Sequence, residues 1–208
     1  VEYDAVLGPH RVRAGDVVLA LASSGLHSNG YSLVRRVVAS AGWALDRHVE
    51  EFGRTLGEEL LEPTRVYSAD LLALIRADGV AVHALSHVTG GGLAANLARV
   101  LPAGLLARVE RSRWAPPPVF TTIGRLGHVP VLDLERTLNM GVGFVVVVPA
   151  DSADAALRAA AARAIPAWVL GEVTTDSPDA RGISTEVVQG AKGVDGGAVQ
   201  VIGSHPGC

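Results

Sequence analysis

The sequence predicts a mixed α/β domain (α+β-like), in which helices cover one mixed sheet. Apolar runs of strand length alternate along the chain with segments whose apolar residues recur at helical spacing. This alternation is typical of α/β layer structures. Hydrophobic residues make up 49% of the 208 residues and charged residues only 19%, which indicates a globular protein with a well-buried core. Because no linker or repeat divides the chain, we expect one domain over residues 1–208.

The first strand and helix are predicted by clear periodicity. Residues 17–22 are an apolar run, which indicates a buried strand. Residues 31–41 carry apolar side chains at helical spacing, and Gly42 follows as the usual glycine at a helix end. Residues 43–57 show little periodicity, so we expect a connecting segment. Pro63 suits a first helical turn and opens a predicted helix over residues 63–78.

The next elements follow the same alternation. Residues 81–88 predict a strand that runs into a glycine loop, and a short helix then extends from Leu93 until Pro102 ends it. A strand is expected at 105–109, a proline-rich loop at 111–118, and two short helices at 119–126 and 132–138. Residues 142–148 are the clearest buried strand. The remaining predicted elements are a helix at 153–164 and strands at 167–173, 184–188 and 198–202, the last two joined by the glycine-rich residues 190–197.

Composition excludes several functional classes. The net charge of −3 does not favour nucleic-acid binding, which needs a basic face. No apolar run reaches the roughly 18 residues that a membrane span requires, and the first residues do not resemble a signal peptide. The single Cys208 excludes an internal disulfide framework and a cysteine-based metal site. We therefore expect a cytoplasmic protein without membrane or nucleic-acid partners.

The loop between the first strand and the first helix is the first candidate site. It contains Ser23, Ser24, Ser28 and Asn29, whose side chains can donate to anionic oxygens, together with two glycines that allow close backbone approach. The first N–H groups of a helix are unpaired, and the helix dipole favours an anion at this end. The pattern indicates a phosphate or carboxylate site. A helix cap made of turn residues would use the same residue types, so this alternative stays open.

A second glycine loop, Thr89-Gly90-Gly91-Gly92, also lies between a predicted strand and a helix. Three successive glycines cost chain entropy, which close approach by a ligand or by another backbone would explain. Tight packing of the helix against the sheet is the alternative. Gly141 and Gly143 flank Val142 at the start of the strand 142–148, where we favour a structural role.

Histidines are the remaining candidates for chemistry. His27 lies in the first loop, where it could contact an anion or transfer a proton. His83 and His87 share one face of the predicted strand 81–88. No acidic residue stands at ligand spacing to them, so we expect no metal site.

Five segments, in this order, resemble the carboxyl-terminal half of phosphoribosylformylglycinamidine cyclo-ligases, the aminoimidazole ribonucleotide synthetases. Residues 15–17 read Gly-Asp-Val, and residues 23–33 read Ser-Ser-Gly-Leu-His-Ser-Asn-Gly-Tyr-Ser-Leu. Residues 61–65 read Leu-Glu-Pro-Thr-Arg, residues 85–92 read Leu-Ser-His-Val-Thr-Gly-Gly-Gly, and residues 136–143 read Arg-Thr-Leu-Asn-Met-Gly-Val-Gly. The resemblance covers residues 15–173, whereas the tail after Asp176 is less distinctive. Several motifs in a fixed order are far more specific than any single one.

The resemblance implies an α/β domain with partly ferredoxin-like topology and a role in purine biosynthesis. Such enzymes use ATP to close the imidazole ring of formylglycinamidine ribonucleotide, by a route in which the formyl oxygen is phosphorylated and becomes a leaving group. The family's amino-terminal domain supplies the dimer contact and most of the ATP and Mg²⁺ site. This sequence shows no counterpart of that domain's Asp-Gly-x-Gly-Thr-Lys motif. The expectation is therefore a substrate-binding half that is inactive without its amino-terminal domain and homodimeric in the full-length enzyme.

The same resemblance places both glycine loops at the active site. We assign the substrate phosphate to the polar and glycine residues of the two loops and a catalytic role to His27. Related ATP-dependent enzymes (selenophosphate synthetase, thiamine-phosphate kinase and the amidotransferase of the preceding purine step) and a non-catalytic binding domain are the alternatives. The predicted phosphate-binding residues are Ser24, Ser28, Asn29, Gly30, Thr89, Gly90, Gly91 and Gly92.

Overall fold

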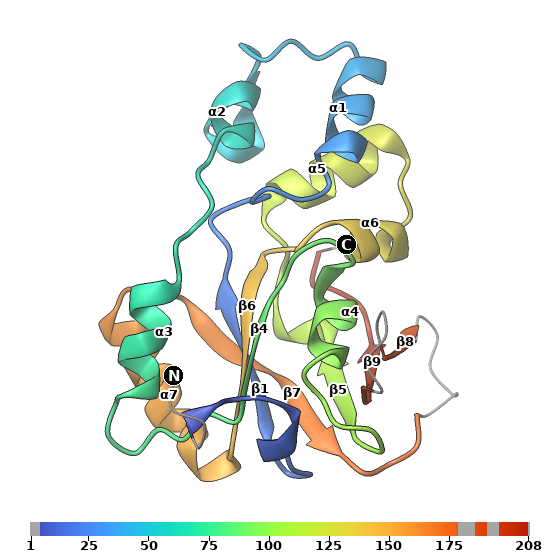
Figure 1. The fold of residues 1–208 in the computed structure, drawn as a ribbon. Coiled ribbons are helices and arrows are strands. Elements are labelled where there is room, and N and C mark those ends of the chain that lie inside the picture. The colour runs from blue at the N-terminus through green and yellow to red at the C-terminus, as the bar shows by residue number, and fades with distance from the viewer. Residues whose placement is uncertain (1–4, 179–185, 191–195, 208) are drawn as a thin grey trace.

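A computed structural model describes residues 5–178, 186–190 and 196–207. A seven-stranded sheet with the order β4-β6-β1-β7-β5-β9-β8 forms its centre (Figure 1). The expected mixed sheet covered by helices is thereby confirmed. Part of the expected strand 184–188, most of the loop 190–197, and Cys208 lie outside the described residues. The strands are β1 Val17–Ala22, β4 Ala84–His87, β5 Leu106–Glu110, β6 Val142–Val148, β7 Ala167–Thr174, β8 Glu186–Gln189 and β9 Ala198–Ile202, with a separate small pair β2 His48–Val49 and β3 Arg54–Thr55.

Seven α-helices of the described chain surround this sheet, and most begin close to their predicted positions. None of the described helices is long and apolar enough to cross a membrane. The helices are α1 Tyr31–Ser40, α2 Leu56–Leu60, α3 Ser68–Ile75, α4 Gly92–Ala98, α5 Pro118–Gly127, α6 Val131–Thr137 and α7 Ala153–Ala162.

Four strands form the ferredoxin-like part of the fold. In the order β4-β6-β1-β7 every neighbouring pair is antiparallel, with α3 following β1 and α7 following β6 along the chain. This arrangement is the split βαβ pattern of ferredoxin-like domains. The sheet continues beyond β7 through β5, which pairs in parallel with β9, and β8 closes the edge by pairing antiparallel with β9.

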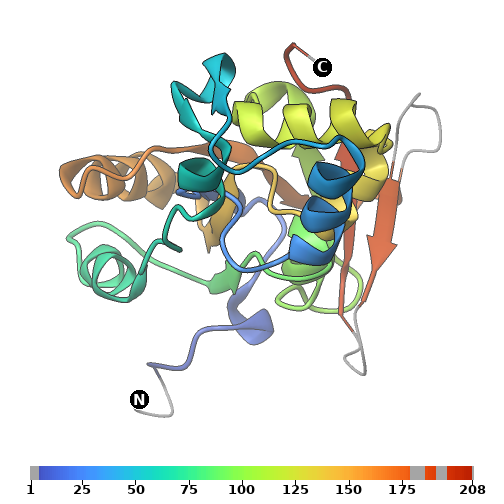
Figure 2. The same cartoon turned by 90° about the horizontal axis from the view of Figure 1, so that it is seen from above.

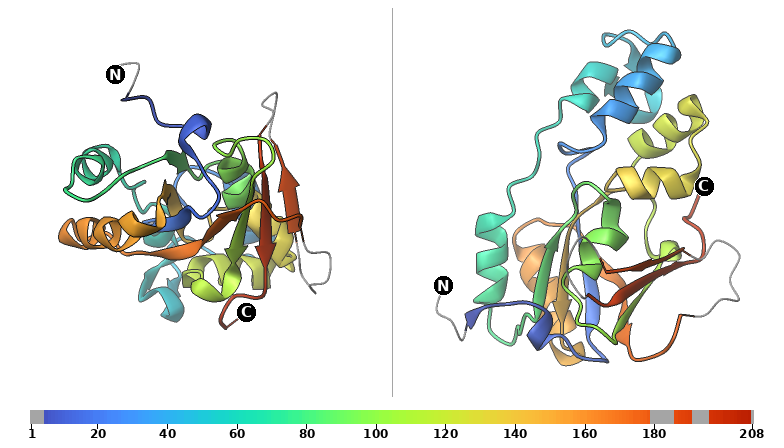
Figure 3. Two further views of the ribbon diagram at one scale, coloured as in Figure 1. Left: turned by 90° about the horizontal axis from the view of Figure 1, so that it is seen from below. Right: turned by 45° about the vertical axis from the view of Figure 1, so that its right-hand side comes forward.

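Alternating side chains of β1 divide the core between the two faces of the sheet, as a strand's twofold period requires. Leu19 and Leu21 pack in a cluster with residues of α3 and α7, which lie side by side (Figure 2). Val18 and Ala20 belong to the cluster on the opposite face, which α4 covers with Leu93. A third cluster joins α1, α5 and α6, and α1, α2 and α5 stand beyond the upper edge of the sheet (Figures 1 and 3).

Two expectations about the segment before α3 are wrong. Residues 43–57 are not merely a connection, because they contain the small strand pair, a 3-10 turn and the start of α2. The predicted helix 63–78 begins only at Ser68. Its first residues are irregular instead, and they contact the first loop: the Pro63 carbonyl accepts a hydrogen bond from the Ser24 hydroxyl, and the Arg65 N–H donates to the same hydroxyl. The Pro63 carbonyl is thereby used by Ser24, whereas in a helix it would have accepted from the N–H four residues later.

Candidate functional site

Strand directions bring the two glycine loops to one edge of the sheet. Both β1 and β4 are antiparallel to β6, so the carboxyl ends of β1 and β4 lie at the same edge, beside the start of β6. The loop 23–30 leaves β1 at this edge and leads into α1, while the loop 88–91 leaves β4 and leads into α4 (Figure 1). The sequence therefore predicted correctly that each loop joins a strand to a helix start.

The loops also approach one another. A Cβ atom placed on Gly90 would lie 3.7 Å from Oδ1 of Asn29. Gly30 and Gly91, the residues that precede the first turns of α1 and α4, both have positive φ angles, of 79° and 97°. Such angles are ordinary only for glycine. The backbone thus requires glycine at both helix starts, and Gly30 also packs against α6, where a Cβ atom would lie 2.2 Å from a Leu138 methyl group.

A strap formed by residues 61–66, between α2 and α3, lies against the first loop. The hydroxyl of Ser24 donates to the Pro63 carbonyl over 2.6 Å and accepts from the Arg65 N–H over 3.1 Å. The hydroxyls of Ser28 and Thr64 lie 3.1 Å apart. Ser24 therefore ties the loop to the strap through its own hydroxyl, whereas Ser28 is exposed at the loop surface.

Arg65 is a strap residue to which our sequence reasoning gave no role, and its backbone N–H bonds to Ser24 of the first loop. The strap places it at the loop, its Nε atom is buried without a hydrogen-bond partner among the described residues, and its side chain makes only a long ion pair of 3.7 Å with Asp70. The Leu-Glu-Pro-Thr-Arg segment was a recognisable motif. Assigning it to a helix hid the fact that it faces the loop.

The side chain of a buried asparagine forms hydrogen bonds with each glycine loop. Asn139 accepts hydrogen bonds from the Ser23 hydroxyl and the Gly141 N–H and donates to the Gly25 carbonyl. Asn96 of α4 donates over 2.7 Å to the Gly92 carbonyl and accepts from the Thr89 hydroxyl.

Both asparagines are buried, with exposed fractions of 4% for Asn139 and 3% for Asn96. Neither was singled out from the sequence as a site residue. Buried amides that are fully hydrogen-bonded in this way fix loop geometry.

His27 is buried inside the first loop. Its side chain is only 4% exposed, and its backbone has φ of 59°, which is uncommon for a residue other than glycine. Nε2 accepts a hydrogen bond from the Ser24 N–H over 3.2 Å, while Nδ1 is buried without a partner among the described residues. The rings of Tyr67 and His87 lie 6.1 and 6.4 Å away. Burial, and secondarily the charge of His87, lower the pKa of His27.

Gly143 makes room for this group of rings. A Cβ atom on Gly143 would lie 1.9 Å from the Tyr67 hydroxyl oxygen and 2.8 Å from Cε1 of His27. The Tyr67 hydroxyl itself donates to the Ala22 carbonyl over 2.6 Å, and burial raises its pKa. His87 stacks on Phe144, with a centroid distance of 5.3 Å. The favoured structural role of Gly143 is thus supported, and it directly serves the neighbourhood of His27.

The other strand histidine has a different environment. Nδ1 of His83 lies 2.7 Å from a carboxylate oxygen of buried Asp16, away from the glycine loops. In the described parts of the chain, no group of three or more histidine, cysteine or carboxylate residues is placed to hold a metal ion.

A buried ion-pair network lies next to the second loop, on the side of α6. The guanidinium of Arg111, 2% exposed, donates to both carboxylate oxygens of Glu135 over 2.7 Å, and Nε2 of His205 lies 2.9 Å from the same carboxylate. The backbone carbonyl of Glu135 faces Gly92, where a Cβ atom would lie only 1.6 Å away. The network therefore anchors Glu135 of α6, the residue whose backbone carbonyl packs against the start of α4.

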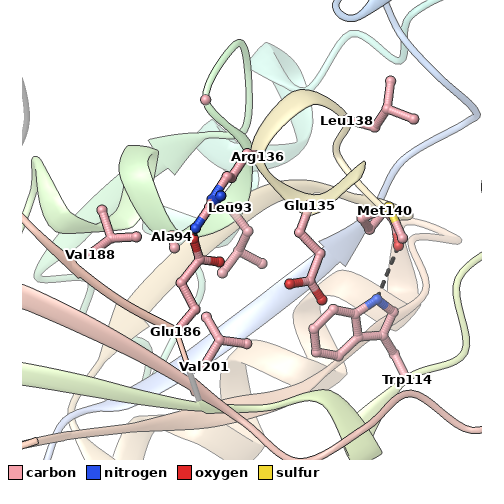
Figure 4. A pocket seen from close by; sticks show the side chains of 11 residues that line it. Leu93, Ala94, Trp114, Glu135, Arg136, Leu138, Met140, Glu186, Val188 and Val201 are labelled. Atoms are coloured by element: carbon pink, nitrogen blue, oxygen red, sulfur yellow. Dashed lines mark hydrogen bonds and ion pairs between the residues drawn. The ribbon is translucent and has the colours of Figure 1, made fainter. Parts of the chain in front are cut away.

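Figure 4 shows a small cavity next to this network, lined by residues of α4, α6, β8 and β9. Arg136 and Glu186 approach each other at one side and form an ion pair of 2.7 Å, while the Trp114 indole donates to the Met140 carbonyl. The small cavity has a volume of about 30 Å³, close to that of one water molecule. A larger cavity of about 760 Å³ lies between α5 and α6. At the glycine loops themselves, Ser28, Gly90 and Gly91 are exposed at the surface, and Gly91 also lines the small cavity.

Comparison with solved structures defines the class of protein to which this fold belongs. Thiamine-monophosphate kinase from Stenotrophomonas maltophilia matches 98% of this chain and 55% of its own, with a TM-score of 0.60 and 20% sequence identity. The hydrogenase maturation protein HypE matches the whole chain and 58% of its own, with a TM-score of 0.53 and 22% identity. At these identities the likeness shows a shared α/β fold.

Sequence comparison narrows the class to one family. The family described as "AIR synthase related protein, C-terminal domain" matches residues 13–182. A Streptomyces fradiae protein provisionally named phosphoribosylformylglycinamidine cyclo-ligase is 62% identical over 164 residues, covering 78% of this chain and 89% of its own. The Sorangium cellulosum phosphoribosylformylglycinamidine cyclo-ligase is 48% identical over 84% of this chain. The chain belongs to the AIR synthase related family and corresponds to its C-terminal domain.

The coverage differs between these relatives. The chain spans 51% of the Sorangium cellulosum enzyme and 52% of a cyclo-ligase from Anaeromyxobacter, to which it is 46% identical. It therefore spans about half the length of these relatives. The predicted resemblance to the carboxyl-terminal half of cyclo-ligases is confirmed.

Proposed function

We propose that this chain is the substrate-binding half of an ATP-dependent cyclo-ligase that converts formylglycinamidine ribonucleotide to aminoimidazole ribonucleotide in purine biosynthesis. The names of the curated relatives support this reaction. The observation that carries the proposal is the meeting of two glycine loops at one edge of the sheet, with Asn29 of one loop next to Gly90 of the other. Two helix starts that face a common surface are suited to an anionic group.

The phosphate of the ribonucleotide is the group that this surface would hold. Ser28 and Asn29 offer side-chain donors, Gly30 precedes α1, and the Thr89–Gly91 backbone borders the other side, whereas Gly92 is buried against the Glu135 carbonyl of α6. Ser24 would act by fixing the strap, because its hydroxyl already bonds to Pro63 and Arg65. Arg65 would add the positive charge that the predicted set lacks.

ATP and Mg²⁺ would be held mainly by an amino-terminal domain. Mg²⁺ prefers carboxylate oxygens and water, and the described residues offer no cluster of such ligands at the glycine loops. When bound, ATP would supply the phosphoryl group that activates the formyl oxygen. The present residues would bind and orient the ribonucleotide and hold it away from water. On this proposal the isolated chain is inactive, and the full-length enzyme is a cytoplasmic homodimer.

The alternatives predict different ligands. A thiamine-phosphate kinase, selenophosphate synthetase or amidotransferase domain would share the fold, and a purely binding domain would need no partner domain. Identities of 62% and 48% to proteins named as cyclo-ligases favour the cyclo-ligase over these. The thiamine-monophosphate kinase likeness, at 20% identity, concerns the fold.

The decisive experiment measures steady-state kinetics in the intact two-domain enzyme. Ser28→Ala removes a donor from the proposed phosphate site, so KM for formylglycinamidine ribonucleotide is expected to rise about tenfold while KM for ATP changes little. Ser40→Ala is the matched control, because Ser40 is an exposed serine at the far end of α1. Unchanged kinetics in Ser28→Ala and in Gly91→Val would refute the assignment of the phosphate to these loops.

A further inference from the structure

The tautomer of His27 follows from a single hydrogen bond. The Ser24 N–H donates to Nε2 over 3.2 Å, and a nitrogen that accepts a hydrogen bond carries no proton. The neutral ring must then hold its proton on Nδ1. That nitrogen is therefore a donor, and it is buried without a partner among the residues that the structure describes. Buried donors are nearly always hydrogen-bonded, so an orphan of this kind calls for an explanation.

The surroundings of the ring do not favour a charged imidazolium. The groups whose rings face His27 are Tyr67 from the start of α3 and His87 from β4, neither of which supplies a negative charge. The Tyr67 hydroxyl is already used by the Ala22 carbonyl. Protonation would also break the bond from Ser24, because Nε2 would become a donor facing another donor. The lowered pKa of His27, caused by burial first and by His87 second, agrees with this geometry.

The backbone of His27 is strained in the conformation that places the neutral ring inside the loop. A positive φ is unfavourable for histidine, and such outliers persist where the surrounding structure imposes them, often at functional sites. Gly143 leaves the space that the ring edge and the Tyr67 hydroxyl occupy. The strain, the burial and the unpaired donor therefore coincide in one residue of the proposed site.

We propose that His27 acts as a permanently neutral hydrogen-bond donor, whose Nδ1–H binds an acceptor oxygen of the ribonucleotide, and does not act as a proton-transferring acid or base. The identity of the ligand in this proposal rests on the proposed function, whereas the tautomer of His27 follows from its hydrogen bond with Ser24. The acceptor is an oxygen of the phosphate or of the formyl group, since both are strong acceptors without a proton to offer. Because Nδ1 is buried in the unbound loop, the ligand would reach and satisfy this orphan donor as the loop shifts to expose it.

The tautomer is tested first, without any substrate. In the ¹⁵N-labelled chain, long-range proton–nitrogen correlation spectra are expected to show His27 with a protonated Nδ1 and an unprotonated Nε2 throughout pH 6–8. Tyr67→Phe and His87→Gln spectra assign the neighbouring signals. A protonated Nε2, or a ring that becomes charged within this range, would overturn the proposal whether or not the loops bind phosphate.

The ligand is tested next by titration. Ribose 5-phosphate is expected to shift the Nδ1–H signal if the phosphate is the acceptor. If only formylglycinamidine ribonucleotide shifts it, the formyl oxygen is the acceptor. If both bind, as followed at Ser28 and Gly90, yet neither shifts the Nδ1–H signal, the proposal is wrong although the proposed function survives.

Two substitutions separate the nitrogens in the intact enzyme. The amide N–H₂ of His27→Asn occupies the place of Nδ1, whereas the amide of His27→Gln reaches the place of Nε2 and keeps an acceptor for Ser24. We expect His27→Asn to retain KM within a few-fold, and His27→Gln to raise KM about tenfold or more. Thermal unfolding of both variants corrects for differences in folding. The proposed role would be overturned if KM rose equally in both variants at equal thermal stability. It would also be overturned if kcat/KM of the wild-type enzyme varied with pH and this variation disappeared in His27→Asn.

Discussion

Nδ2 of Asn139 donates to the carbonyl oxygen of Gly25 over 2.9 Å, although the two residues lie 114 positions apart in the sequence. The same amide accepts from the Gly141 N–H over 2.8 Å and from the Ser23 hydroxyl. The start of β6 thus holds the first glycine loop through one buried side chain. The geometry of this loop depends on a residue that does not belong to it.

Asn139→Ala is expected to reduce the free energy of unfolding by about 3 kcal/mol, because it leaves buried backbone groups of Gly25 and Gly141 without partners. Urea denaturation followed by circular dichroism measures this loss. Asn29→Ala is the control, since Asn29 lies in the same loop and its side chain makes no comparable buried hydrogen bond with the described residues; its cost should stay below about 0.5 kcal/mol. Equal costs for the two variants would contradict the holding role of Asn139.

Gly143 and Tyr67 should be energetically coupled. Gly143→Ala places a Cβ atom 1.9 Å from the Tyr67 hydroxyl oxygen, so we expect a loss of about 2–3 kcal/mol. Tyr67→Phe removes that oxygen and its bond to Ala22, at a cost of about 1 kcal/mol. In the double variant the clash is partly relieved, and a coupling of about 1 kcal/mol or more is expected from the double-mutant cycle. Strictly additive losses would show that the close approach does not exist.

The same substitution should destabilise the protein strongly at Gly92 and hardly at all at Gly90. Gly92→Ala would bring Cβ to 1.6 Å from the Glu135 carbonyl at a φ of +71°, so we expect a loss of at least about 3 kcal/mol or a failure to fold. Gly90→Ala meets only Asn29, at 3.7 Å, and should change stability by less than about 0.5 kcal/mol.

The Gly90 variant also serves as a folded probe of the site. Its added methyl group lies on the surface between the loops, so ribose 5-phosphate should bind more weakly, as isothermal titration calorimetry would show. Unchanged affinity in this folded variant would argue against a ligand between the loops.

Glu135 gives the stability a defined pH dependence. Burial alone would raise the pKa of this carboxyl, but the hydrogen bonds from Arg111 and His205 outweigh burial and lower it. A carboxyl with a lowered folded-state pKa contributes stability above its unfolded pKa of about 4.3, and loses it as the pH falls through the folded-state value. Stability should therefore fall in acid below about pH 4.3, and Glu135→Gln should weaken this dependence.

The same variant tests the network at neutral pH. Glu135→Gln removes the carboxylate charge that faces the buried guanidinium of Arg111, and a cost of about 3–5 kcal/mol is expected in thermal or urea unfolding. Arg113→Gln is the control, because the pair of Arg113 and Glu110 is exposed and should contribute less than about 1 kcal/mol. A small cost for Glu135→Gln would show that the network is not important for stability.

Local patterns predicted much of the fold. The strands at 17–22 and 142–148 have the predicted bounds, and the helices at 119–126 and 132–138 are found within one residue of their predicted starts. Helix α2 was missed, although Thr55 and Glu58 form a capping box that is visible as a spacing of three residues. The late start of α3 had no such local signal, because Ser24 lies about forty residues away from the backbone groups that it binds.

The sequence by itself determined that two glycine loops join strands to helices and that both could receive an anion. It did so because hydrophobic period, turn residues and helix starts depend on neighbours along the chain. Only the tertiary structure decided that Asn139 and Asn96 hold these loops, that Arg65 lies beside them, and that His27 keeps an unpaired Nδ1. The partner of a buried polar group is chosen by whichever distant segment the packing brings within about 3 Å, and no local pattern records that choice.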